Sequence, residues 1–200
     1  MKTGLFGGTF DPIHNAHIAL AKTAMAQLEL DRVLFITSAD PPHKKGTTTL
    51  SAEVRHKLVS LAIENEESFL PCDIEIKREG YSYSYYTVLE LKENLPDDEL
   101  VFIVGGDSLA YIDKWYNAPE LLKLCTFAAY PRGEIDCESL NAIAVDLQTR
   151  FGTDCKVINA PCIDISSTAL RDLLHKGDDI NGLMPGKVAE YIKEFNLYKE

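Results

Sequence analysis

The chain has 200 residues, of which 46% are hydrophobic and 26% are charged, and its formal net charge is −11. These proportions are ordinary for a globular protein, and we expect a single domain over residues 1–200. The negative charge argues against non-specific binding to nucleic acids or to anionic membranes, and no apolar run is long enough to cross a bilayer.

The first predicted strand, Lys2–Phe6, leads through Gly7 and Gly8 toward a helix predicted over residues 15–28. Because Met1 runs directly into this strand, we expect no signal peptide and a cytoplasmic location. The glycines let the backbone approach a ligand closely. A helix start offers unpaired N–H groups and a partial positive charge, so this junction is suited to a phosphate.

Two histidines, His14 and His17, stand three residues apart where this helix begins. Residues at that spacing share one face of a helix. A tight turn with solvated histidines is the simplest interpretation, but the preceding glycines and the helix start favour a functional one. The stretch is neither a G-x-G-x-x-G fingerprint nor a Walker A loop.

Further along the chain, predicted strands and helices alternate. The strands are Arg32–Thr37, Asp73–Lys77, Leu100–Val104, Thr126–Tyr130 and Lys156–Ile158, and the helices cover residues 51–65, 87–95, 119–124, 138–151, 166–176 and 185–195. This alternation predicts a Rossmann-like α/β fold, with an open, mostly parallel sheet, helices on both faces and a short C-terminal helical portion at about 166–200. If the first strand and Leu100–Val104 are neighbours, the ligand crevice lies between their carboxyl ends.

The helix over residues 51–65 has one predicted core face, made by Val54, Leu58, Leu61 and Ala62. Arg55 and His56 are predicted to lie at the surface. The five cysteines contain no C-x-x-C pair, so we expect reduced thiols and no zinc site.

Three other segments contain residues suited to nucleotide chemistry. Pro41-Pro42-His43-Lys44 follows the second strand and carries a basic tail, which suits either a solvated loop or a loop that reaches a phosphate. Four tyrosines within residues 81–86 could cover the core or stack on a planar base. Near residue 166, Ser and Thr side chains are ordinary helix caps, but Arg171 lies one turn further and can point at the same anion.

The stretch GGTFDPIHNAH at residues 7–17 resembles the signature of the H-x-G-H nucleotidyltransferases, and of the nicotinate mononucleotide adenylyltransferases in particular. Pro-Pro-His-Lys at 41–44, Ser-Tyr-Ser at 82–84, Gly-Gly-Asp-Ser at 105–108 and Ile-Ser-Ser-Thr-Ala-Leu-Arg at 165–171 follow in the family's order. Two departures occur: Ala16 stands where the family usually has Gly, and Ser84 where it has Thr.

This resemblance implies transfer of AMP from ATP to nicotinate mononucleotide, giving deamido-NAD and pyrophosphate in NAD biosynthesis. It implies Mg2+ bound with ATP, no metal held by the protein alone, and no nucleic-acid or membrane partner; a homo-oligomer is left open. The implied catalytic residues are His14, His17, Lys44 and Arg171. The implied ATP-binding residues are Gly7, Gly8, Thr9, Phe10, Gly105, Asp107, Ile165, Ser166, Ser167 and Thr168, and the acceptor-binding residues are Tyr83, Ser84, Trp115 and Arg132.

Alternatives remain at this stage. Within the enzyme class, the acceptor could be nicotinamide mononucleotide, a phosphopantetheine or glycerol phosphate. The aromatic residues Tyr83 and Trp115 favour a planar acceptor, because a flexible one gains little from a stacking wall. Outside that class, the chain could be a nucleotide sensor without catalytic activity, which the presence of both histidines and Arg171 argues against.

Overall fold

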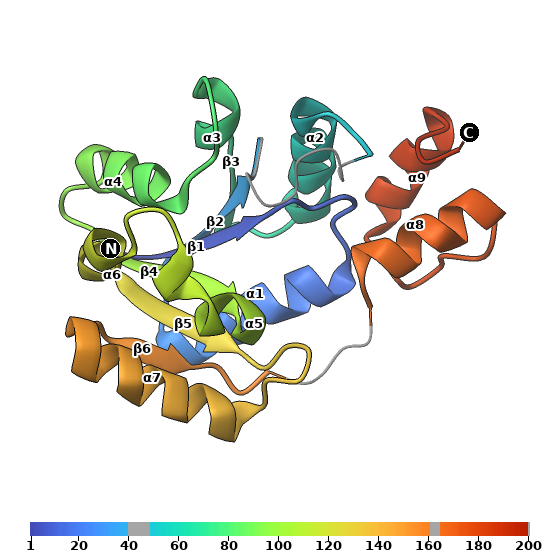
Figure 1. Ribbon diagram of the computed structural model, residues 1–200. Helices are drawn as coiled ribbons and strands as arrows, with labels where there is room; N and C mark the ends of the chain where they lie inside the picture. Colours follow the sequence, from blue (N-terminus) through green and yellow to red (C-terminus); the bar gives the residue numbers. More distant parts are fainter. Residues whose placement is uncertain (40–48, 161–164, 200) are drawn as a thin grey trace.

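A computed structural model describes residues 1–39, 49–160 and 165–199, and a parallel sheet runs through its centre (Figure 1). The described strands follow the order β3-β2-β1-β4-β5-β6, and every neighbouring pair is parallel. Their bounds are Lys2–Gly8 (β1), Arg32–Thr37 (β2), Phe69–Cys72 (β3), Glu99–Gly105 (β4), Thr126–Tyr130 (β5) and Cys155–Val157 (β6). This is the Rossmann-like α/β architecture that the sequence predicts.

Helices connect the strands and cover both faces of the sheet. They are Asn15–Leu28 (α1), Ala52–Ile63 (α2), Ile74–Lys77 (α3), Ser84–Asn94 (α4), Gly106–Ala110 (α5), Ala118–Leu124 (α6), Cys137–Phe151 (α7), Ser167–Lys176 (α8) and Gly186–Glu194 (α9), with a 3₁₀ helix at Ile112–Lys114. In the part of the chain that the structure describes, none of these helices is both long and apolar enough to cross a membrane.

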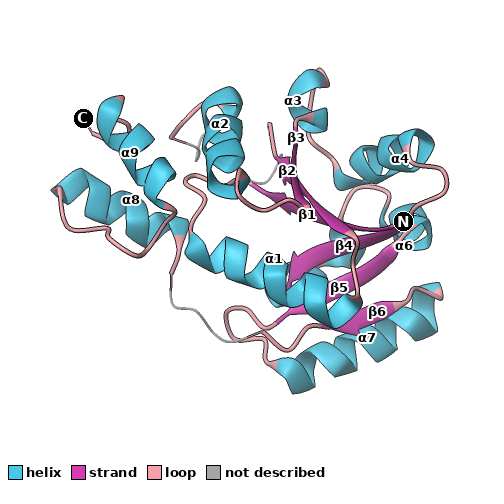
Figure 2. Ribbon diagram, turned by 180° about the vertical axis from the view of Figure 1, so that it is seen from behind, coloured by secondary structure: helices cyan, strands magenta, loops and turns pink. Residues whose placement is uncertain are grey.

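The sheet separates two apolar cores. On one face, α1, α2, α8 and α9 pack against residues such as Phe6, Phe35 and Ile103; on the other, α3 to α7 pack against residues such as Leu5, Phe102 and Phe127. Alternate residues of each strand point to opposite faces, so a strand covered on both sides must be apolar throughout. Figure 2 shows α8 and α9 together at one end of the molecule, beyond the start of α1.

The strand order reverses between β1 and β4, which are direct neighbours with Phe6 opposite Ile103. From β1 the chain proceeds outward through β2 and β3, and then returns to the other side of β1 through β4. The loops that leave β1 and β4 therefore diverge at their carboxyl ends, which is where α/β sheets bind ligands. The reversal of strand order thus lies between β1 and β4, where the ligand crevice is predicted.

The predicted strand Asp73–Lys77 is wrong. Those residues form the end of a turn and the short helix α3, and the strand lies just before them at Phe69–Cys72, paired with β2. The alternation of Ile and charged residues in 73–77 suggested a strand. In the structure, however, Ile74 and Glu75 are both buried although they are consecutive, and the main-chain carbonyl of Asp73 accepts from the N–H groups of Ile76 and Lys77. Pro71 is tolerated in β3 because β3 is an edge strand.

Candidate active site

The two motif histidines stack on each other at the start of α1. Their ring centroids are 3.7 Å apart, and Nδ1 of His17 accepts a hydrogen bond of 3.2 Å from the main-chain N–H of His14. A neutral imidazole that accepts through Nδ1 carries its proton on Nε2. The backbone therefore sets the tautomer of His17, with the proton on Nε2.

His14 is neutral at physiological pH. Its side chain is buried, and this burial, together with the nearby positive charge of Arg132, lowers its pKa to about 4. Within the described residues its Nδ1 has no hydrogen-bond partner. A buried imidazole without such a partner is unfavourable for folding, and exceptions of this kind gather at functional sites.

Phe10 forms the floor beneath the histidines. Its backbone is left-handed, with φ of 50°, and the residue is 2% exposed. The centroids of the Phe10 and His17 rings lie 5.1 Å apart in an edge-to-face arrangement. A Cβ on Gly8 would lie 2.8 Å from the Phe10 ring, so glycine is required there. The buried ring of Phe10 packs against His17, and its predicted binding of ATP stays a prediction.

The C-terminal motif lies against the same loop. The hydroxyl of Ser167 donates to the main-chain carbonyl of Pro12 at 2.9 Å, and Nη1 of Arg171 donates to that of Asp11 at 2.8 Å. Arg171 also donates to the Thr168 hydroxyl through Nη2 at 3.3 Å, and Ser166 caps α8 by accepting from a main-chain N–H. The starts of α1 and α8 are thus held side by side, which brings two sets of helix N–H groups to one place.

The end of β4 supplies a third part of the crevice. A Cβ on Gly105 would collide with the Asp107 carboxylate, at 2.5 Å, and with the Arg132 side chain. Nε of Arg132 lies 3.7 Å from Oδ2 of Asp107, and both side chains are exposed. Arg132 was predicted to bind the acceptor, and the structure places it beside Gly105 and Asp107, which were predicted to bind ATP. Its positive charge also helps to lower the pKa of His14.

The tyrosine-rich segment meets the segment that contains the tryptophan. The rings of Tyr83 and Tyr116 lie 4.6 Å apart, and the hydroxyls of Tyr86 and Tyr116 are hydrogen-bonded at 2.9 Å. Trp115 is half-buried and meets Phe102 edge to face at 6.3 Å. Helix α4 begins at Ser84, earlier than predicted, so Ser84 is a helix-start residue. The two predicted acceptor segments therefore form one aromatic wall.

The structure brings most of the predicted site residues to the carboxyl edge of β1 and β4. Lys44 was predicted to be catalytic and lies outside the described residues. Ile165 packs partly buried against the first core, and Thr9 contributes a main-chain carbonyl that Arg55 contacts.

Sequence reasoning missed Arg55, which was predicted to lie at the surface and is 1% exposed. Its guanidinium donates to the main-chain carbonyls of Thr9 at 2.5 Å, Leu50 at 3.1 Å and Ala39 at 3.3 Å. The prediction failed because a charged residue in an amphipathic helix is normally solvated. Three main-chain carbonyls satisfy it here, one from the β1–α1 loop and two from the segment between β2 and α2, and no helix periodicity signals that arrangement.

Glu75 is a second buried charged residue that was not predicted. Burial raises the pKa of its carboxyl group, and Oε1 accepts a hydrogen bond of 2.8 Å from the Thr87 hydroxyl. Thr87 lies one turn into α4 from Tyr83. The contact fixes the start of α4, and with it the tyrosines, against α3.

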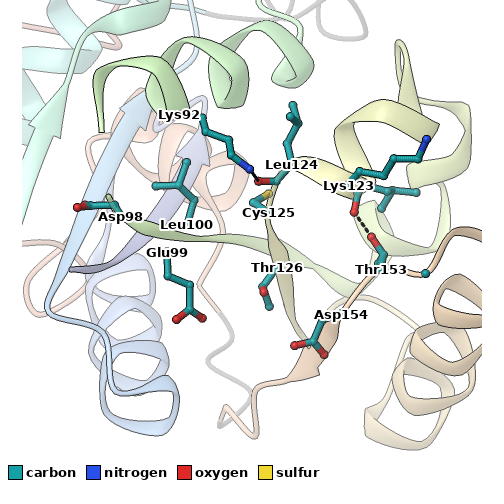
Figure 3. Close-up of a pocket in the computed structure, with 12 residues that line it drawn as sticks. Lys92, Asp98, Glu99, Leu100, Lys123, Leu124, Cys125, Thr126, Thr153 and Asp154 are labelled. Carbon is teal, nitrogen blue, oxygen red and sulfur yellow. Dashed lines mark hydrogen bonds between the residues drawn. The ribbon is translucent and has the colours of Figure 1, made fainter. Parts of the chain in front are cut away.

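Among residues 1–39, 49–160 and 165–199, no group of three or more His, Cys, Asp or Glu side chains could hold a metal ion. A hollow of about 330 Å³ opens at the opposite edge of the sheet, near the starts of β4 and β5 (Figure 3). Its polar groups are already used within the protein: Lys92 donates to the Leu124 carbonyl and Thr153 to the Leu122 carbonyl. That hollow is separate from the motif residues.

Comparison with known proteins agrees with this geometry. Residues 5–173 match the cytidylyltransferase-like family. Proteins named probable nicotinate-nucleotide adenylyltransferase from Clostridium novyi (strain NT) and Clostridium tetani (strain Massachusetts / E88) are 40% and 35% identical over 198 residues, 99% of both chains in each case. A solved structure of Plasmodium falciparum nicotinic acid mononucleotide adenylyltransferase complexed with NaAD is 24% identical, with a TM-score of 0.79 over 99% of this chain and 98% of its own, which shows that the fold is shared.

We predict that Gly8→Ala destabilises the protein by about 1–3 kcal/mol, because the added methyl group overpacks against the buried Phe10 ring. Gly7→Ala is the matched control, since a Cβ there makes an ordinary contact of 3.8 Å with Phe102. Urea unfolding without nucleotides measures both variants. Equal stability of the two would contradict the packing described here.

We also predict that His14 contributes to acid destabilisation. Between its unfolded pKa of 6.5 and its folded pKa of about 4, the unfolded chain binds a proton that the folded chain does not, so stability falls as pH drops through this window. At about 1.4 kcal/mol per pKa unit, this amounts to roughly 3.5 kcal/mol over the whole window, of which about 2–3 kcal/mol falls between pH 7 and pH 4.5. His14→Asn keeps a polar side chain at the N-cap position and should remove that component.

The measurement is the free energy of unfolding at about pH 7 and about pH 4.5 for the wild type, His14→Asn and the exposed control His175→Asn. The His14 variant should show the smallest loss of stability on acidification. A pH dependence identical to that of the wild type would show that His14 is not buried in its neutral form.

Proposed function

The chain belongs to the nicotinate-nucleotide adenylyltransferase family, and we propose that its crevice transfers AMP from ATP to nicotinate mononucleotide. The products are deamido-NAD and pyrophosphate, a step of NAD biosynthesis. The observation that carries this proposal is the pairing of two helix starts, α1 and α8, at the carboxyl end of β1. Hydrogen bonds from Ser167 and Arg171 to the β1–α1 loop make that pairing.

The chemistry needs alignment and charge neutralisation. The 5′-phosphate of the acceptor is already anionic, so no general base is required. One of its oxygens forms a new bond to the α-phosphorus of ATP, while the bond from that phosphorus to the bridging oxygen breaks and pyrophosphate leaves with the electron pair. The transition state places negative charge on oxygens around one phosphorus, which fixed donors stabilise most effectively.

The described residues can supply these donors. Nε2–H of His17, whose tautomer the His14 main chain sets, is suited to an α-phosphate oxygen. The neutral ring of His14 can donate one hydrogen bond without a change of protonation, since its pKa lies far below 7. Arg171 holds its guanidinium between Asp11 and Thr168, which orients a permanent positive charge toward the outer phosphates. Lys44 is proposed for the same phosphates from the sequence alone.

Mg2+ would enter with ATP and neutralise charge on its phosphates. The described residues fit a metal that is held mainly by phosphate oxygens and water, because both carboxylate oxygens of Asp11 accept hydrogen bonds and Asp107 faces Arg132. The protein's own contribution is then to orient the triphosphate.

The two sides of the crevice suit the two nucleosides. Gly105 and Asp107 are proposed to bind the ribose of ATP, because the exposed Asp107 carboxylate, which packs against the bare Cα of Gly105, can accept from hydroxyls. The wall of Tyr83, Tyr116 and Trp115 is proposed to take the pyridine ring of the acceptor. We place the reaction in the cytoplasm; the four described cysteines are free thiols, which is consistent with a reducing compartment.

We predict that His17→Ala leaves the fold intact and lowers kcat by about 10²–10³, the usual cost of removing one transition-state donor. His175→Ala, an exposed histidine in the last turn of α8, is the control and should retain wild-type turnover. Circular dichroism and steady-state pyrophosphate release measure both variants. Near wild-type turnover in His17→Ala would remove this residue from the mechanism.

The choice of acceptor tests the proposed function itself. A pocket that offers N–H donors favours the carboxylate of nicotinate and leaves the donors of nicotinamide unpaired, at about 1–3 kcal/mol for each buried group. We predict a kcat/KM at least tenfold higher for nicotinate mononucleotide than for nicotinamide mononucleotide at saturating Mg-ATP. Equal values, or a preference for the amide, would overturn the assigned acceptor, and no pyrophosphate release with either would overturn the proposed activity.

In the same assay, Trp115→Ala should raise the KM for the acceptor far more than the KM for ATP. Phe195→Ala, an exposed aromatic residue after α9, provides the control and should change neither. Equal effects of Trp115→Ala on both substrates would show that Trp115 does not belong to the acceptor wall.

A further inference from the structure

Tyr198 is buried beneath the β1–α1 loop, although it follows α9 and lies 187 residues from the loop residue that it contacts. Its side chain is 3% exposed, and its hydroxyl donates a hydrogen bond of 2.7 Å to Oδ1 of Asp11. Its φ of 62° is in the left-handed region, which is uncommon for an aromatic residue. The surrounding structure therefore holds Tyr198 in an unfavourable backbone conformation, with its hydroxyl directed at Asp11.

Asp11 joins this hydroxyl to the phosphate-binding residues. Its other carboxylate oxygen, Oδ2, accepts from the main-chain N–H of Thr49 at 2.8 Å, and its main-chain carbonyl accepts from Nη1 of Arg171 at 2.8 Å. The Asp11 side chain is 3% exposed. Because both carboxylate oxygens are engaged inside the protein, Asp11 shapes the loop and does not face the substrates.

Arg55 completes the arrangement on the other side of the loop. It donates to the Thr9 carbonyl, two residues before Asp11, and its positive charge lies close enough to Asp11 and Tyr198 to interact with both. The same charge balances the buried carboxylate of Asp11, which would otherwise be costly to keep ionised. The loop from Thr9 to His14 is therefore held at Thr9 by Arg55 and at Asp11 by Tyr198, Thr49 and Arg171.

Resting on the proposed adenylyl transfer, we propose that Tyr198 is a positioning residue: through Asp11 it fixes the β1–α1 loop so that His14, His17 and Arg171 align on the triphosphate. Its ring fills space under the loop, and its hydroxyl sets the orientation of the Asp11 carboxylate. Loss of that hydroxyl alone removes no group that contacts the substrates, but it leaves those groups poorly aligned. Misplacement by about 1 Å in such a site can cost up to about 10²-fold in rate.

The test is Tyr198→Phe, which keeps the ring and removes the hydroxyl. We expect kcat to fall about 10- to 100-fold while the KM values for ATP and acceptor change less than about threefold, because the contacts with substrate are retained. Tyr191→Phe is the matched control: Tyr191 lies on α9 against Phe195, and among the described residues its hydroxyl has no hydrogen bond. The control should keep wild-type kcat.

A double-mutant cycle separates positioning from a general effect on stability. If Tyr198 acts through Asp11, adding Tyr198→Phe to Asp11→Ala should lower kcat little further, whereas independent effects would multiply. Asp11→Ala removes both side-chain acceptors, those for the Thr49 N–H and the Tyr198 hydroxyl, and tests the loop even if Tyr198→Phe folds poorly. Wild-type kcat in either single variant, or multiplicative losses in the double variant, would overturn the proposal.

The turnover of the wild type distinguishes a failure of the positioning role from a failure of the proposed function. If the wild type releases no pyrophosphate, the proposed function fails, and the positioning role is then read from hydrogen exchange of the main-chain amides in the β1–α1 loop. Tyr198→Phe should speed that exchange relative to Tyr191→Phe, and equal exchange rates would overturn the role. If the wild type is active and Tyr198→Phe is equally active, only the positioning role fails.

Discussion

The hydrogen bonds that tie the β1–α1 loop to the C-terminal part of the chain are the constraint on which the site depends. Ser167, Arg171 and Tyr198 reach back over 155, 160 and 187 residues to Pro12 and Asp11. Parallel strands alone would place the loop at the correct edge of the sheet but would not set its shape. The helices α8 and α9 therefore act as more than a cover for the first core, because they complete the geometry around the motif histidines.

Although the net charge of the chain is −11, positively charged side chains lie at the candidate site. Arg171 is fixed at the crevice by two hydrogen bonds, and Arg132 lies near enough to influence His14. His14 itself is kept neutral by burial, so it offers a hydrogen bond without adding a mobile proton. Anionic substrates thus meet a small set of oriented cations and donors, which raises the local affinity for phosphate against an unfavourable overall field.

The sequence predicted the elements of this site where the local pattern decides the structure. The junction of a strand, two glycines and a helix start placed His14 and His17 correctly at the start of α1, and the parallel sheet followed from apolar strands that alternate with helices. Arg55 could not be predicted, because its burial depends on the fold bringing the Thr9 carbonyl, 46 residues away, together with those of Ala39 and Leu50.

Long-range contacts explain the other differences between prediction and structure. The role of Asp11 depends on Tyr198, whose position is decided by the packing of α9 against the first core. The helix α3 was mistaken for a strand because four residues are too few for helical periodicity to appear. Local patterns thus indicated the residues that are proposed to face the substrates, whereas the residues that hold them in place became visible only in the fold.

In the proposed reaction, AMP moves directly from ATP to the acceptor phosphate, with the protein aligning the two and forming no covalent bond to either. The most direct measurement uses ATP that carries sulfur at one stereochemically defined oxygen of the α-phosphate, and determines the configuration at phosphorus in the product. A single in-line displacement predicts inversion of configuration. Retention would indicate two displacements through a covalent enzyme intermediate, and would rule out direct transfer of AMP between the two substrates.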